Sequence, residues 1–148
     1  MPYPGGPQID RLSTSGKPVF DLPSPLLKNG NLSYSGLKTA VVNLMHNAAQ
    51  RGEKLPAEDV CASFSRAALE PLLSLAEKHL KRLGLKTLAL AGGVAANGYL
   101  RGRAESLARK NGFKLLLPEK KLCTDNGAMV ASQGYFLLAE KASTATLP

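Results

Sequence analysis

Apolar residues spaced three and four apart predict two long amphipathic helices in the first half of the chain. The first begins at Ser35, a candidate N-cap, and ends at Gly52. The second begins near Pro56, is bent or interrupted at Pro71 and ends at Gly84. We expect both helices to turn their apolar faces inward. These faces carry Leu37, Val41, Leu44 and Ala48 in the first helix, and Val60, Phe64, Ala68, Leu72, Leu75, His79 and Leu83 in the second.

The first 35 residues are expected to form a loop-rich lead-in. Residues 1–8 are a Pro/Gly turn region, and residues 9–15 show a short helical pattern that Gly16 ends. Residues 19–22 are apolar enough to predict a short strand before a long loop.

The second half predicts a strand at residues 86–91, a glycine loop, a helix at 98–111 and a strand at 113–117. This order implies two parallel strands joined by a right-handed crossover. A last helix is expected from Thr124 past Tyr135. Its inward positions would be Ala128, Ala131, Tyr135 and Leu138.

These elements predict an α/β fold in which helices flank a small mixed sheet. We expect a single domain over residues 1–142 and a flexible tail at 143–148. The chain has 148 residues, of which 44% are hydrophobic and 20% charged, as in ordinary globular domains. No apolar run reaches the length of a membrane span, so no membrane partner is expected.

Composition also indicates the cellular compartment and the kind of partner. Two distant cysteines and an N-terminus without a secretion pattern favour a cytoplasmic location. The net charge of +8 favours an anionic partner such as nucleic acid or a nucleotide. The basic clusters are also compatible with ordinary solvated helix faces, which are the more common explanation.

Two loops are expected to meet at the carboxyl ends of the two parallel strands, where α/β sheets bind ligands. The first, residues 92–97, carries Gly92 and Gly93, which allow close approach of the backbone to a phosphate. The second, residues 118–124, delivers Asp125 beside the first. This convergence is the main structural argument for a site.

The polar residues of these loops each have two interpretations. Asn97 either caps the following helix or hydrogen-bonds a ligand. Asp125 either stabilises a helix N-terminus or binds a metal ion. His46 and His79 are expected to be packed core residues, and Cys61 is expected to be buried. We do not expect Cys123 to act as a nucleophile.

Four motifs occur in a characteristic order: YPGGP at 3–7, SYSGLKTA at 33–40, GGVAAN at 92–97 and LCTDNGAM at 122–129. Together they resemble the C-terminal half of the tRNA N6-adenosine threonylcarbamoyltransferases. The resemblance covers nearly the whole chain. It implies the C-terminal domain of an actin-like, sugar-kinase-type ATPase fold. It also implies transfer of a threonylcarbamoyl group from threonylcarbamoyl-AMP to N6 of the adenosine beside the anticodon of a tRNA.

The resemblance also implies site residues. Gly6 would lie at the nucleoside, Gly92 and Gly93 on the phosphate side, and Asn97 at the adenylate. Asp125 would be one ligand of a divalent metal, iron or zinc, whose other ligands are two histidines of an H-x-x-x-H helix. That helix belongs to the N-terminal half of the family fold, and no H-x-x-x-H occurs in this sequence.

The sequence is therefore expected to supply an incomplete part of the enzyme, inactive alone. Its partners would be tRNA, the N-terminal half of the fold and other subunits of the threonylcarbamoyladenosine synthesis complex. The alternative is a non-catalytic nucleotide-binding or assembly subunit of the same complex. A metallopeptidase is disfavoured because the sequence has neither a zinc-binding histidine pair nor its general-base glutamate.

Overall fold

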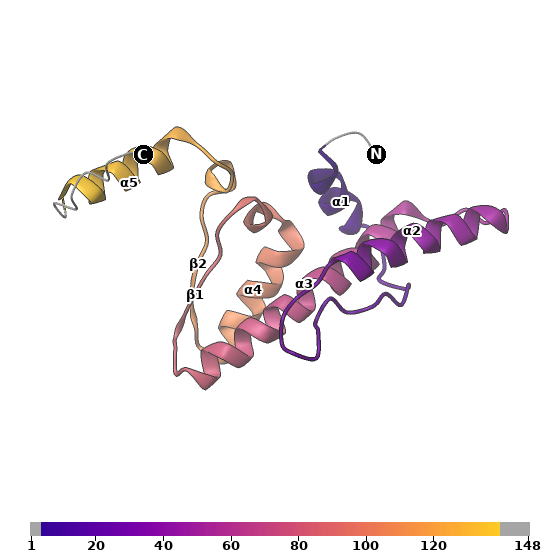
Figure 1. Ribbon diagram of the computed structural model, residues 1–148, viewed down its shortest axis with the longest axis horizontal. Helices are drawn as coiled ribbons and strands as arrows, with labels where there is room; N and C mark the ends of the chain where they lie inside the picture. Colours follow the sequence, from indigo (N-terminus) through magenta and orange to yellow (C-terminus); the bar gives the residue numbers. More distant parts are fainter. Residues whose placement is uncertain (1–3, 140–148) are drawn as a thin grey trace.

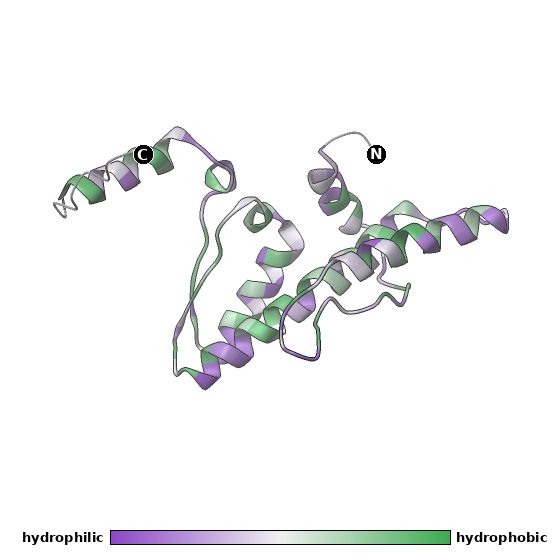
Figure 2. Cartoon of the chain, in the orientation of Figure 1, coloured by the Kyte–Doolittle hydropathy of each residue, from purple (hydrophilic) through white to green (hydrophobic). Residues whose placement is uncertain are grey.

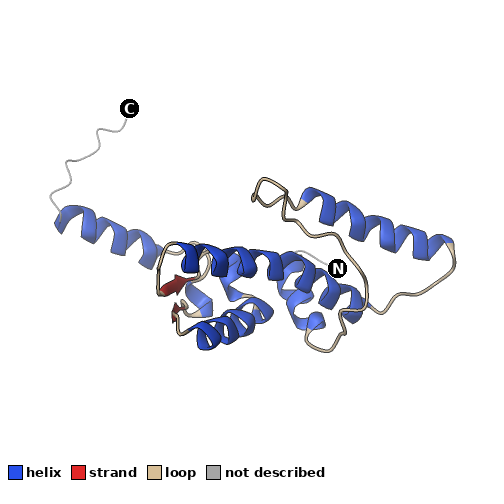
Figure 3. Ribbon diagram, turned by 90° about the horizontal axis from the view of Figure 1, so that it is seen from below, coloured by secondary structure: helices blue, strands red, loops and turns tan. Residues whose placement is uncertain are grey.

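The computed structural model describes residues 4–139, and helices make up most of this part (Figures 1 and 3). The elements in chain order are α1 (Gly5–Ser13), α2 (Ser35–Gln50), α3 (Ala57–Arg82), β1 (Thr87–Ala89), the 3-10 turn η1 (Gly93–Ala96), α4 (Gly98–Asn111), β2 (Lys114–Leu116), the 3-10 turn η2 (Lys120–Leu122) and α5 (Gly127–Ala139). The predicted tail at 143–148 lies outside the described residues, as does the end of the predicted domain.

The sheet consists of β1 and β2, which pair in parallel with Leu88 opposite Leu115. The predicted parallel pair joined through a helix is therefore confirmed, and the fold is α/β. The prediction of a mixed sheet is wrong for the described residues, because their sheet contains these two parallel strands alone. Helix α4 connects the strands and packs against α3.

Helix α3 is the longest element and continues through Pro71 without interruption. Its buried face differs from the predicted one. Leu72 and Leu75 are half-buried, and Leu83 is exposed. The buried residues are Cys61, Ala62, Ser63, Ser65, Ala68, Leu69, Leu73 and Leu80. Small side chains make up most of this buried face and allow neighbouring segments to approach closely, whereas the predicted face followed the larger apolar residues and shares only Ala68 with it.

The hydrophobic core lies where α2, α3 and α4 meet. Leu37 of α2 is 1% exposed. With it cluster Ala68, Leu69, Leu73, Leu100 and Ala104. The predicted inner face of α2 is supported, since Leu37 and Ala48 are buried and Val41 and Leu44 are half-buried. The helix has Tyr34 rather than Ser35 at its N-cap.

Helix α1 begins at Gly5, four residues before the predicted start and inside the expected turn region. Pro4 is extended at the N-cap, and Pro7 is tolerated in the first turn because first-turn N–H groups have no acceptor within the helix. Residues 19–22 form no strand. Instead, the N–H of Phe20 donates to Oγ of Ser63 at 3.0 Å, so a side chain of α3 replaces a strand partner.

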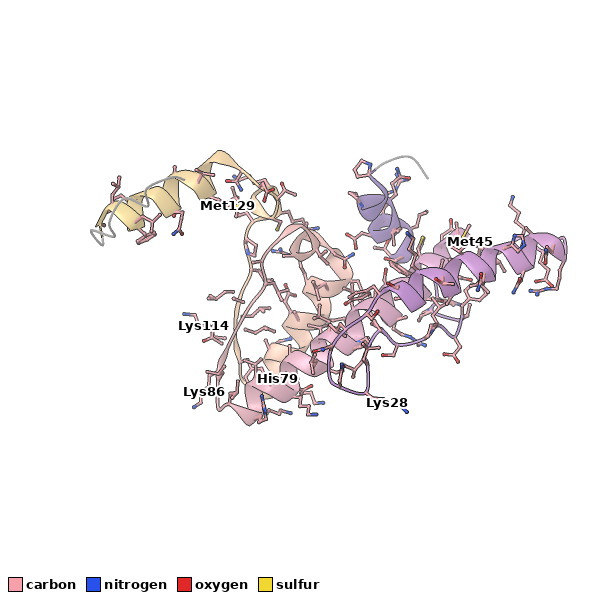
Figure 4. All side chains as sticks on the ribbon, viewed as in Figure 1. Lys28, Met45, His79, Lys86, Lys114 and Met129 are labelled. Carbon is pink, nitrogen blue, oxygen red and sulfur yellow. The ribbon has the colours of Figure 1, made fainter. Side chains whose placement is uncertain are left out.

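The two histidines are exposed, so the prediction that they belong to the core is wrong. Nε2 of His46 lies 3.0 Å from Gln50 Nε2, and Nδ1 of His79 lies 3.1 Å from Arg82 Nη2. His79 lies near the C-terminal end of α3 (Figure 4). Cys61 is buried as predicted.

Helix α5 begins at Gly127 rather than Thr124 and extends away from the other elements (Figure 1). None of its residues is buried, so the predicted inward positions are wrong in this chain. Its sequence contains no charged residue, and it is largely apolar (Figure 2). Among the described residues, no helix combines the length and hydropathy needed to cross a membrane.

Candidate functional site

A cleft of about 800 Å³ opens between α1, α3 and the two 3-10 turns that follow the strands. Its floor is apolar and comes mainly from α3. Around the floor lie polar groups and glycines of distant segments. The lining residues are Gly6, Pro7, Ile9 and Asp10 of α1, Tyr34, then Phe64, Ser65, Ala68, Leu69 and Leu72 of α3, Gly93, Val94 and Ala96 of η1, Asn97, and Lys120 of η2.

Three of the predicted site residues, Gly6, Gly93 and Asn97, line this one cleft. Gly92 and Asp125 do not. The cleft adjoins the loops that leave the carboxyl ends of β1 and β2, and η1 and η2 pack against each other. The predicted convergence of the two loops is therefore present, and α1 contributes a wall that strand topology alone does not predict.

Asp10 joins α1 to the N-terminus of α4. Its two carboxylate oxygens each accept from the N–H of Gly98 at 2.9 Å. A carboxylate at this position satisfies a helix N-terminal donor and complements the helix macrodipole. The first N–H of α4 therefore already has an acceptor within the protein, whereas Gly93, in the turn that precedes α4, borders the cleft.

Asn97 is the N-cap of α4. Its Oδ1 accepts from the N–H of Leu100 at 2.8 Å, in extended backbone geometry. The capping interpretation is thus correct for Oδ1. Because Asn97 also lines the cleft, its Nδ2 group remains chemically able to donate to a ligand.

Gly92 and Gly93 have different roles in the turn before α4. Gly92 has a φ of +80°, a left-handed conformation that other residues adopt with strain. Gly93 begins η1, and a Cβ placed there would meet Thr124 Cγ2 at 3.9 Å, an ordinary contact. Gly92 therefore shapes the turn from outside the cleft, whereas Gly93 borders the cleft.

Arg101 fastens the two loops together. Its Nη1 donates to the carbonyl of Ala95 at 2.9 Å and to that of Pro118 at 3.0 Å, and Nη2 also donates to Pro118 at 3.0 Å. The sequence shows Arg101 only as one of several basic residues on the helix at 98–111, which are either solvated or face an anionic partner. Its half-buried position bridging η1 and the segment before η2 becomes visible only in the fold.

Tyr34 and Lys120 are further cleft residues that sequence reasoning did not assign to a site. The hydroxyl of Tyr34 donates to the carbonyl of Ala68 at 3.2 Å, and burial raises the pKa of this phenol. Tyr34 does lie within the SYSGLKTA motif, which is the signal that could have identified it.

Asp125 is exposed in the segment between η2 and α5. The cap of α5 is Asn126, whose Oδ1 accepts from the N–H of Met129 at 3.1 Å. Within residues 4–139, no three His, Cys, Asp or Glu side chains form a group able to hold a metal ion. The described residues therefore do not make a metal centre by themselves, and Asp125 would fit one only as a single oxygen ligand.

Residues 1–132 match the family model TsaD, tRNA N6-adenosine threonylcarbamoyltransferase. The chain is 45% identical to the tRNA N6-adenosine threonylcarbamoyltransferase of Dictyoglomus turgidum, a match that covers 91% of this chain and 41% of that protein. It is 46% identical to the protein of the same name from Bacillus anthracis, over 99% of this chain and 43% of the relative. The chain thus spans about two fifths of the length of these relatives.

The crystal structure of T. kodakarensis HypF has a similar fold, with a TM-score of 0.64 and 21% identity. The similarity covers 93% of this chain and 18% of HypF. At this identity the comparison supports the arrangement of the elements and carries no statement about activity.

Proposed function

Because the chain belongs to the tRNA N6-adenosine threonylcarbamoyltransferase family, we propose that its cleft binds the adenylate part of threonylcarbamoyl-AMP. One observation carries this proposal: Gly6 of α1 is far in sequence from Gly93 and Asn97 of the glycine loop, yet all three residues border the same cavity. An apolar floor with a few convergent polar groups is typical of a small-molecule site. The volume of about 800 Å³ is sufficient for a nucleotide.

The reaction we propose for the complete enzyme is an acyl transfer to tRNA. The N6 nitrogen of adenosine attacks the carbamoyl carbon, a C–N bond forms, the C–O bond to the phosphate breaks, and AMP leaves while the nitrogen loses a proton. The chain's contribution would be to bind and orient the adenylate. Backbone dipoles of the η1 turn would stabilise charge that develops on the leaving phosphate. The net charge of +8 supports tRNA as the second substrate.

The test exploits the two functions of Asn97. Asn97→Ser keeps an N-cap for α4 but removes the amide donor, whereas Asn97→Ala removes both. We expect both variants to lose AMP affinity in calorimetry. Only Asn97→Ala should also lower the melting temperature, by a few degrees for about 1 kcal/mol. Unchanged AMP affinity in Asn97→Ser would show that the side-chain amide of Asn97 does not contact AMP. Absence of AMP binding by the natural chain would refute the proposal.

Asp125 is proposed as one ligand of a divalent metal, iron or zinc, in the complete enzyme. The remaining ligands would come from outside the described residues, since these contain no sufficient group. Its position in the chain supports this, because the exposed Asp125 follows η2, the turn after β2 that packs against η1 of the cleft.

A partner containing the N-terminal half of the family fold is supported by α5. This helix exposes an uncharged, largely apolar surface, and the relatives are more than twice as long as the matched region. We propose that the complete assembly is an actin-like, sugar-kinase-type fold with the cleft between its halves. The same surface favours the second candidate function, an assembly subunit of the tRNA-modification complex.

A further inference from the structure

Lys120 is the basic residue among the described residues that line the cleft. We propose that its ammonium group binds the phosphate of the bound adenylate and thereby distinguishes a nucleotide from a nucleoside. This inference rests on the proposed adenylate function and assigns a phosphate-recognising side chain to it.

The backbone around Lys120 is held beside the glycine turn. Two residues earlier, the carbonyl of Pro118 accepts from Arg101, which also binds Ala95 of η1. On the other side, the N–H of Cys123 donates to the carbonyl of Lys120 at 3.2 Å, and the Cys123 side chain is buried. Lys120 is therefore anchored at both ends of its turn, close to Gly93, while its side chain is exposed.

The carboxylates near Lys120 are engaged by other groups, which leaves its ammonium group available to bind an anion. Lys121 pairs with Glu119, with Nζ 2.9 Å from Oε2. Asp10 is the carboxylate of the cleft lining, and both of its oxygens are engaged by Gly98. Within residues 4–139 no ion pair involves Lys120.

An unpaired ammonium beside a glycine turn is a chemically suitable phosphate site. The lysine supplies a point charge with three donors, and the turn allows the backbone to approach the anion closely. Because the Lys120 side chain is exposed, its contribution should be modest and should weaken as salt rises. Adenosine lacks the phosphate and should not depend on this residue.

The experiment compares the full chain with Lys120→Gln and with the control Lys121→Gln, whose lysine already pairs with Glu119. Calorimetry at low salt gives the dissociation constants for AMP and for adenosine. We expect Lys120→Gln to lose about three- to tenfold in AMP affinity. Its adenosine affinity should be unchanged, and Lys121→Gln should bind both ligands like the natural chain.

Retained adenosine binding also reports that the variant cleft is folded. An unchanged AMP affinity in Lys120→Gln, or an equal loss for AMP and adenosine, would overturn the assignment while leaving the adenylate site in place. An equal AMP loss in Lys121→Gln would overturn it as well, since general basic charge would then suffice. Failure of the natural chain to bind either ligand would instead refute the adenylate function itself, together with this inference.

Discussion

Gly16 shows how a single residue fixes the position of the segment that follows α1. A Cβ at this position would lie 2.0 Å from the carbonyl oxygen of Glu58 on α3, far inside any real contact. The adjacent N–H of Lys17 donates to Asp59 Oδ1 at 2.7 Å, so the backbone is tied to α3 at this point. The glycine is required by this close approach, in addition to ending the helical pattern.

Gly16→Ala is therefore expected to destabilise the chain by about 1–3 kcal/mol, because backbone must separate from backbone. Gly102→Ala is the matched control, since Gly102 lies inside α4 and open space surrounds its added Cβ. That change should stabilise by roughly 0.5–1 kcal/mol through helix propensity. Urea denaturation of both variants checks the pair, and equal stability of Gly16→Ala and the natural chain would contradict the close approach.

Residues whose partners are near in sequence could be predicted, and those with distant partners could not. Asn97 and Gly112 end α4 at the predicted positions, because capping and a left-handed C-cap are local properties. Asp10 could not be assigned, since its partner Gly98 is 88 residues away. Arg101 has the same difficulty, because nothing local distinguishes a loop-bridging arginine from a solvated one.

At the scale of elements, α3 and α4 are joined by a polar cluster centred on Glu70. Arg103 donates to both carboxylate oxygens, and the Tyr99 hydroxyl donates to Oε1 at 2.8 Å. The hydrogen bond from Arg103 lowers the pKa of Glu70; burial opposes this shift, and the Tyr99 bond adds to it. Burial, then the bond to Glu70, raises the pKa of Tyr99 to about 12, so its hydroxyl remains a donor at neutral pH.

A depressed carboxyl pKa adds stability above the unfolded-state pKa of about 4.3, and this stability is lost as pH falls through the folded-state pKa. Glu70→Gln should therefore melt a few degrees lower at pH 7, and the difference should vanish in acid. Glu105→Gln, at an exposed position on α4, is the control and should melt like the natural chain at both pH values. A constant difference across the acid range in Glu70→Gln would show that the charge of Glu70 is not responsible.

The order of the elements was predictable because strand and helix signals alternate along the chain. The structure of residues 19–22 and the exposure of α5 could be learned only from the fold. Residues 19–22 resemble a strand by composition, but the N–H of Phe20 donates to Ser63 of α3 and the N–H of Val19 donates to the carbonyl of Lys17, so no strand among the described residues pairs with this segment. The apolar positions of α5 predict burial, but the described residues provide nothing that covers them. Hydrophobic periodicity indicates that a helix has a partner, and it carries no information on which chain segment supplies that partner.

At the scale of the whole molecule, α5 is the feature that departs most from a self-contained domain. Val130 is 74% exposed and Leu138 is 79% exposed, on a helix without charge. Such a surface is costly to leave in water, and helices of this kind are usually covered in an assembly. The family relatives are more than twice as long as this chain, so they contain further residues that could cover α5.

The proposed contact between α5 and an N-terminal partner predicts that two glutamates on α5 prevent assembly without unfolding the rest of the chain. We expect the double variant Val130→Glu, Leu138→Glu to lose binding to the purified N-terminal half of the Bacillus anthracis relative in size-exclusion chromatography. Val42→Glu is the control, because Val42 is 58% exposed on α2. It should still form the complex.

Since the cleft does not include α5, the double variant should also bind AMP like the natural chain. Complex formation by the double variant would show that Val130 and Leu138 are not buried in this contact, because two buried charges without counter-ions would oppose it by several kcal/mol.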